Sequence, residues 1–192
     1  MSLRDILTGR HEVKGPAPDR LFAIATAYVS LSAEQGIVST GRAAIVFQAL
    51  QTADFQSALG ETEELVGATG GESGTKVSSS EDEFGYRWMV FENGGEEAVE
   101  DLAVGINAVS GSIEAAGHGE RLLCAAFAFR DSQSRPLYLI YSYKRGTWYP
   151  FAPSGDKERA TERELQMKAK IGAELPIEPE LERWFPLWGI PI

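Results

Sequence analysis

The chain has 192 residues, 43% of them hydrophobic, so it is long enough to bury a sizeable core as one domain. Its formal net charge of −10 repels polyanions and argues against a general nucleic-acid binder. A single cysteine excludes an internal disulfide, and two histidines nearly exclude four-ligand zinc sites built from Cys and His.

The charge is spread unevenly along the chain. Residues 49–120 contain 15 acidic and two basic residues, a net of −13, whereas residues 140–172 contain four acidic and seven basic residues, a net of +3. The N-terminus lacks a secretory apolar core, and no run of about 18 apolar residues could span a bilayer. The sequence therefore favours a cytoplasmic protein without integral membrane insertion.

The first residues form a short amphipathic turn with Leu3, Ile6 and Leu7 on one face. We expect this face to dock onto the body of the protein or onto a partner, because three apolar side chains anchor weakly in lipid. A stretch rich in Gly and Pro then breaks the chain. A helix follows from Asp19, but residues 26–31 fit either a helix or a strand.

Residues 43–48 predict a strand, and the spacing of Phe55, Leu59 and Leu65 predicts the helix after it. The stretch 75–92 predicts a hairpin, in which a polar edge strand precedes a strand rich in aromatic and β-branched residues. The clearest helix comes next, with apolar residues that step by three and four: Val99, Leu102, Ile106, Val109 and Ile113.

Residues 121–131 and 137–144 predict central strands, because they are apolar on both faces. The "KRG" sequence predicts a tight turn into another strand at residues 147–151. Residues 156–172 predict a charged helix. The chain ends in a Pro- and Trp-rich tail at residues 174–192, which is too rich in proline for a long helix.

No catalytic motif is complete. The glycine-rich segments 67–76 and 117–122 lack the order or the strand–helix context of nucleotide-binding loops. We expect His118 to be a solvated turn residue and Cys124 to pack as a small apolar group. The carboxylates at 81–83 suit a solvated hairpin tip better than a cation site. We therefore assign no catalytic residue, metal or cofactor.

Two adjacent cations at the "KRG" turn, beside several aromatic residues, suit a contact with an acidic partner. The plainer interpretation is a hairpin whose tip is charged for solubility. A third is a small hydrolase or ligand-binding protein that uses a cleft near this tip. The residues predicted to bind a partner come from the hairpin and the tail: Lys144, Arg145, Tyr143, Trp148, Trp184, Phe185 and Trp188.

Five segments carry a family resemblance: "GRAAIVF", "EDEFGYRWMVFE", "RLLCAAFAFRD", "PLYLIYSYKRGTWYPFAP" and "LPIEPELERWFPLWG". Together they resemble the phage-shock-protein-A-associated protein B family (PspAB) over nearly the whole chain. The resemblance implies a cytoplasmic, non-enzymatic accessory or adaptor of the membrane-stress response. Its implied partner is phage shock protein A or a related stress-response protein, and it implies no catalytic residue or cofactor.

The predicted fold is a single α+β domain over residues 1–192, with an antiparallel sheet of about five or six strands and helices packed on it. The order of elements is similar to that of the type III secretion chaperone-like fold. Both faces of the central strands must be covered. Helices can cover one face, and the Trp-rich tail or a second subunit of a homodimer must cover the other.

Overall fold

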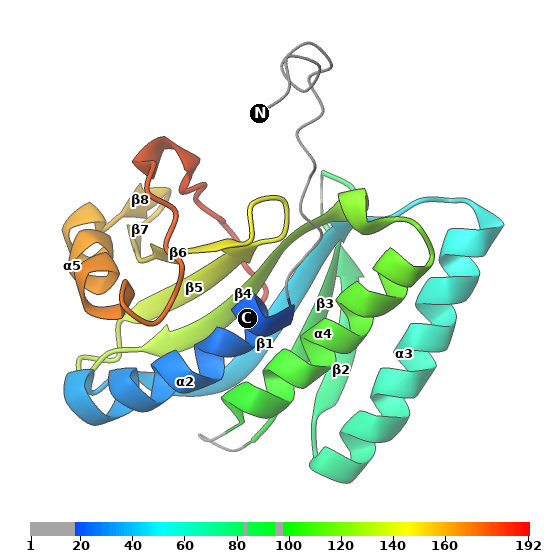
Figure 1. Ribbon diagram of the computed structural model, residues 1–192, viewed down its shortest axis with the longest axis horizontal. Helices are drawn as coiled ribbons and strands as arrows, with labels where there is room; N and C mark the ends of the chain where they lie inside the picture. Colours follow the sequence, from blue (N-terminus) through cyan, green and yellow to red (C-terminus); the bar gives the residue numbers. More distant parts are fainter. Residues whose placement is uncertain (1–17, 83, 95–97) are drawn as a thin grey trace, which may run out of the picture.

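The computed structural model describes residues 18–82, 84–94 and 98–192. Six antiparallel strands form one sheet in the order β2-β3-β1-β4-β5-β6, and helices pack against it (Figure 1). The expected α+β class with an antiparallel sheet is therefore confirmed. The predicted amphipathic turn at the N-terminus lies outside the described residues.

The strands of the sheet are β1 (Val38–Gln48), β2 (Lys76–Glu81), β3 (Tyr86–Glu92), β4 (Leu122–Arg130), β5 (Pro136–Ser142) and β6 (Thr147–Phe151). The helices are α2 (Pro18–Gln35), α3 (Ala53–Ser73), α4 (Val99–Ala115) and α5 (Thr161–Ile171). A small hairpin of β7 (Pro153–Gly155) and β8 (Glu158–Arg159) precedes α5, and 3-10 turns lie at Gly119–Arg121 and Leu181–Arg183.

Two local predictions differ from the structure, and one open choice is decided. Residues 26–31, which fitted either a helix or a strand, are helical, and Ile24 and Leu31 lie on a helical stripe that is buried in the core. The charged helix begins at Thr161 instead of residue 156, since the residues before it form the β7–β8 hairpin. On α3, Leu65 is exposed and the neighbouring Val66 is buried.

One face of the sheet is covered by α2, α3 and α4, which lie in front of it in Figure 1. All five apolar positions predicted on α4 are buried there. Gly105 allows α4 to approach β3 closely, because a Cβ at this position would lie 2.7 Å from the ring of Phe91. The ring of Phe91 thus packs directly against the backbone of α4.

The opposite face of the sheet is covered by the C-terminal tail. Residues of β1 alternate between the two cores, with Ile45 in the helical core and Val46 in the other. Trp184 is buried in this second core, and Leu187 and Ile190 pack against it. Of the two coverings expected for this face, the tail is the one that the structure shows.

The two edges of the sheet also differ. At the β6 edge, the backbone N–H of Trp148 donates to Pro176 O at 2.9 Å, and Glu178 N–H donates to Trp148 O at 2.8 Å. A parallel bridge joins Trp148 and Ile177 at the same place. The other edge strand, β2, is short, polar and mostly exposed. The tail therefore continues the sheet beyond β6.

Candidate functional site: the β6 edge and the C-terminal tail

The predicted basic turn joins β5 to β6, and both Lys144 and Arg145 are exposed at its tip. Gly146 N–H donates to Ser142 O at 2.7 Å, and Gly146 has a φ of 64°. A Cβ at Gly146 would also lie 2.9 Å from a guanidinium nitrogen of Arg20, which donates to Gly146 O at 3.1 Å. Glycine is thus favoured at this turn by its backbone angle, and a Cβ there would also displace the end of the Arg20 side chain.

Two aromatic residues predicted to bind a partner beside the tip lie in the core. Tyr143 is 3% exposed and Trp148 is 0% exposed. The indole N–H of Trp148 donates to Arg20 O at 2.8 Å, so this side chain joins β6 to α2. Burial raises the pKa of Tyr143 far above its usual value, so its hydroxyl stays neutral. Neither side chain can reach a partner, which corrects the prediction for both.

A buried carboxylate connects the basic tip to the tail. Glu178 is 3% exposed and accepts hydrogen bonds from the Thr147 hydroxyl and from Glu180 N–H, both at 3.2 Å. A guanidinium nitrogen of Arg145 lies 3.8 Å from its carboxylate, and one of Arg183 lies 3.7 Å from it. The structure thus brings together two regions that the sequence separates by more than thirty residues.

A second buried carboxylate connects the tail to α5. Glu164 is 0% exposed and accepts from Ala152 N–H at 2.9 Å and from Arg159 Nε at 2.9 Å. The same guanidinium donates to Trp184 O at 2.7 Å. These contacts join α5, the β7–β8 hairpin and the tail into one connected network.

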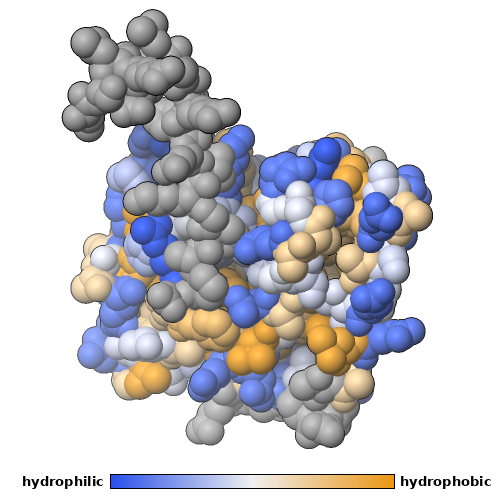
Figure 2. Space-filling model, turned by 45° about the vertical axis from the view of Figure 1, so that its right-hand side comes forward, coloured by the Kyte–Doolittle hydropathy of each residue, from blue (hydrophilic) through white to orange (hydrophobic). Residues whose placement is uncertain are grey.

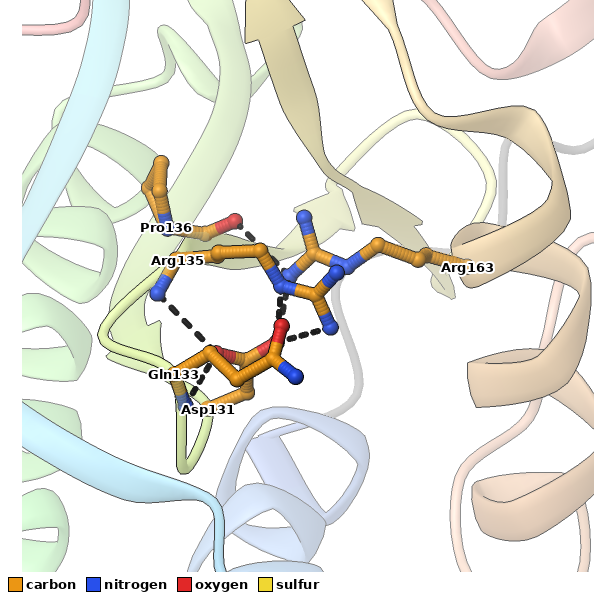
Figure 3. Close-up of polar contacts among 5 residues, drawn as sticks. All are labelled: Asp131, Gln133, Arg135, Pro136 and Arg163. Atoms are coloured by element: carbon orange, nitrogen blue, oxygen red, sulfur yellow. Dashed lines mark hydrogen bonds and ion pairs between the residues drawn. The ribbon is translucent and has the colours of Figure 1, made fainter.

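The turn between β4 and β5 holds the start of α5 in place (Figure 3). Asp131 accepts from the guanidinium groups of Arg135 and Arg163, at 2.8 and 3.2 Å, and from the backbone N–H of Gln133 and Arg135. Arg163 also donates to Pro136 O at 3.3 Å. Partial desolvation raises the pKa of Asp131, but these hydrogen bonds and the charge of Arg135 outweigh it and lower the net pKa.

Trp184 is the buried anchor of the tail. Its side chain is 3% exposed, and its indole N–H donates to Glu178 O at 3.0 Å. Its ring stacks on Tyr149 with 6.4 Å between centroids, and the ammonium of Lys168 lies 5.7 Å from its centroid. Trp184 is therefore a structural residue with no surface left for a partner, which corrects its place among the predicted contact residues.

The next two aromatic residues of the tail remain accessible. Phe185 is 63% exposed, while its carbonyl accepts from the Tyr149 hydroxyl at 3.0 Å. Trp188 is 36% exposed and sets one edge against the ring of Phe151, with 5.1 Å between centroids. Both side chains thus project from a backbone that is fixed to the sheet.

We name the exposed cations of the tip and the exposed aromatics of the tail the β6-edge surface: Lys144, Arg145, Phe185 and Trp188. Sequence reasoning missed the groups that hold this surface together, above all Glu164, Glu178 and Arg159. Their signal in the sequence is weak. Glu178 stands among apolar and proline residues, but its burial depends on Thr147, which lies far from it along the chain.

The remaining candidates have structural roles. His118 lies half-buried in the turn after α4, and its ring packs edge-on against Phe55 with 5.2 Å between centroids, so it is only partly solvated. Burial raises the pKa of Cys124 to about 12, so the thiol stays protonated. Asp82 accepts from Phe84 N–H and Tyr86 N–H and from the indole of Trp88, each at 2.9 Å, as a hairpin tip requires.

A hollow of about 510 Å³ lies between α2 and α4, lined by Phe22, Ala25, Thr26, Val29, Ser30 and Glu100. Neither Lys144 nor Arg145 lines it, so it does not provide the cleft that a hydrolase at the tip would need. Within the described ranges, no three side chains of His, Cys, Asp or Glu gather as metal ligands.

The family model for PspA associated protein B matches residues 1–192, the whole chain. No curated protein and no solved structure matches the chain, so its resemblance to the type III secretion chaperone-like fold is not confirmed. None of the helices in the described part of the chain is long and apolar enough to cross a membrane. The chain belongs to the PspA associated protein B family.

Proposed function

We propose that this protein is a non-enzymatic accessory of PspA in the phage-shock response and that it binds its partner through the β6-edge surface. The family name supports the association with PspA. One observation carries the choice of surface: Phe185 and Trp188 remain accessible on a tail that buried polar groups hold against the sheet. We further propose that it acts in the cytoplasm.

Exposed aromatic side chains on a fixed backbone favour binding. Aromatic residues and Arg are enriched at the centres of protein interfaces, where a few large side chains supply most of the affinity. The backbone around Phe185 is already ordered by the hydrogen bonds at its own carbonyl and at that of Trp184. Binding then loses little conformational entropy, which is the advantage of a preorganised surface.

The basic tip supplies the electrostatic part of this recognition. Lys144 and Arg145 are exposed, and Arg183 lies beside the same buried carboxylate as Arg145. Exposed cations attract an acidic partner and raise the rate of encounter, most strongly at low salt. We therefore propose that the partner presents an acidic patch next to an apolar one.

Capture of the protein by purified, immobilised PspA tests this function. We expect Phe185→Ala with Trp188→Ala to weaken capture at least tenfold, because the change removes both accessible aromatic anchors. Leu65→Ala is a matched control, since Leu65 is also a large exposed apolar residue but lies on α3. Loss of capture in the tail variant, with the control unchanged, is the expected result.

Two outcomes would count against the proposal. If PspA does not capture the wild-type protein at all, PspA is not its partner. If PspA captures the wild type and the tail variant equally, PspA is the partner but does not bind through Phe185 and Trp188. The melting temperature of each variant is measured alongside, so that unfolding of the tail is not mistaken for loss of contact.

A further inference from the structure

The central part of α2 carries no charge on any side. The thirteen residues from Leu21 to Ala33 include no Asp, Glu, Lys or Arg. Leu21, Ile24 and Leu31 of this stretch are buried in the helical core. A helix at the surface of a protein normally presents a charged or strongly polar stripe to water. The uncharged outer side of α2 is therefore a surface that another segment is expected to cover.

The hollow between α2 and α4 lies along this outer side. Its lining on α2 comprises residues 22, 25, 26, 29 and 30, which recur with helical spacing as one continuous stripe. Val29 is 68% exposed within it, and Val104 of α4 is 50% exposed one turn after Glu100. In Figure 2, apolar side chains gather in the lower half of the face in view.

We propose that the occupant of this hollow is the chain's own N-terminal segment, residues 1–17. The sequence places Leu3, Ile6 and Leu7 on one face at helical spacing, and this apolar face suits the uncharged stripe of α2, which includes Phe22 and Val29. The segment joins the body at Pro18, the first residue of the helix that lines the hollow. Docking would bury two apolar faces, one on each side of the contact.

The connecting chain is long enough for this return. Phe22 and Val29 lie four and eleven residues after Pro18, so at about 1.5 Å per helical residue the stripe extends about 6 to 17 Å along α2. The ten residues 8–17 can span up to about 33 Å when extended. Gly15 and Pro16 lie within this connection, where a reversal of the chain direction is needed.

The charges of the two sides are complementary. Residues 1–17 contain Arg4, Arg10 and Lys14 against two acidic residues, a net of +1. The hollow is bordered by Glu100 of α4, within the segment 49–120 that carries a net charge of −13. Cations on the polar side of the docked segment would meet this acidic border instead of a neutral one.

Chemical cross-linking in the full chain tests the proposal without reference to PspA. One variant combines Ile6→Cys with Val29→Cys, and the control combines Ile6→Cys with Leu65→Cys, which places a thiol of similar exposure on α3. The native Cys124 is buried, so it does not compete for a short bis-maleimide reagent. We expect the Ile6–Val29 pair to form an intramolecular cross-link at least tenfold faster than the control pair.

Equal cross-linking of both pairs would overturn the proposal, and so would cross-links that join two chains, which would place a second copy in the hollow. A labelling experiment gives an independent check. The thiol of Val29→Cys should react with a bulky maleimide at least threefold faster when Ile6→Asp is also present, because the charged residue disfavours docking. An unchanged labelling rate would contradict the assignment of residues 1–17 as the occupant.

Discussion

The two faces of the sheet are covered by different kinds of structure. On one face, α2, α3 and α4 bury apolar residues that recur with helical spacing. On the other, the tail covers the strands with only a single 3-10 turn at Leu181–Arg183. An irregular segment can replace a helix in this role only if its backbone groups find partners outside the segment.

The tail satisfies this condition through contacts with the sheet and with β8. Side chains of these elements donate to carbonyl groups along the tail, namely Arg159 to Trp184, Tyr149 to Phe185, Tyr138 to Ile192 and Arg42 to Pro191. A helix satisfies its carbonyls internally and needs no such partners. The tail therefore depends on particular polar side chains, whereas the helical layer depends mainly on its apolar pattern.

The largest effect should follow from removing the buried anchor of the tail. Trp184→Ala removes an aromatic side chain that is 3% exposed, and such a change lowers the free energy of unfolding by about 3–5 kcal/mol. Phe185→Ala, one residue further on, removes a side chain that is 63% exposed and should cost less than about 0.5 kcal/mol. Urea denaturation of both variants checks this, and two equal losses would show that the tail is not anchored through Trp184.

Breaking the network between the tail and α5 should have a smaller effect. Glu164→Gln removes the charge that faces Arg159 while keeping the volume of the side chain. The Arg159 side chain is 25% exposed and can recover some hydration, so we expect the free energy of unfolding to fall by about 1–3 kcal/mol. Glu162→Gln on the exposed side of α5 is the control. A loss no greater than that of the control would mean that Glu164 does not hold the tail.

Acid should weaken the attachment of α5 through Asp131. Its pKa is lowered in the folded protein, so the stabilisation is complete above the unfolded value of about 3.9 and is lost as pH falls through the lower folded value. Asp131→Asn removes this pH dependence of stability and should lower the free energy of unfolding by about 1 kcal/mol at neutral pH. Unfolding curves from pH 6 down to about pH 2.5 check it. An identical pH dependence in wild type and variant would contradict the assignment.

The smallest effect on stability should come from the tip. Lys144→Glu with Arg145→Gln should change the free energy of unfolding by less than about 0.5 kcal/mol, because both side chains are exposed and Arg183 still lies beside Glu178. Glutamine is the better replacement at position 145, since a carboxylate there would face the buried Glu178. Capture by PspA should weaken most at low salt. Thermal unfolding and capture at two salt concentrations separate the two effects.

Helix α4 and the hairpin of β2 and β3 were predictable because their sequence signals are local. The apolar steps along α4 and the hairpin of β2 and β3 depend on neighbouring residues, and the structure has both. The exposure of aromatic residues near the tip was not predictable. Trp148 and Tyr149 point to opposite faces of β6, and the structure covers both faces. The alternation of side chains along the strand therefore could not show that both residues are buried.

The buried carboxylates were unpredictable for a related reason. Glu164 lies on a helix rich in charged residues, where its sequence neighbours Glu162 and Arg163 remain at least partly exposed. Only the approach of Ala152 and the β7–β8 hairpin makes one acidic side chain of this helix a buried acceptor. Such roles follow from tertiary contacts, which a single sequence does not display.

Hydrogen–deuterium exchange of the full chain, alone and with purified PspA, tests the proposed binding surface most directly. The expected result is added protection at residues 143–149 and 184–190 in the complex, with exchange in α3 unchanged. Protection confined to α3 or to the β2 edge, with the β6-edge surface exchanging as in the free protein, would contradict the account.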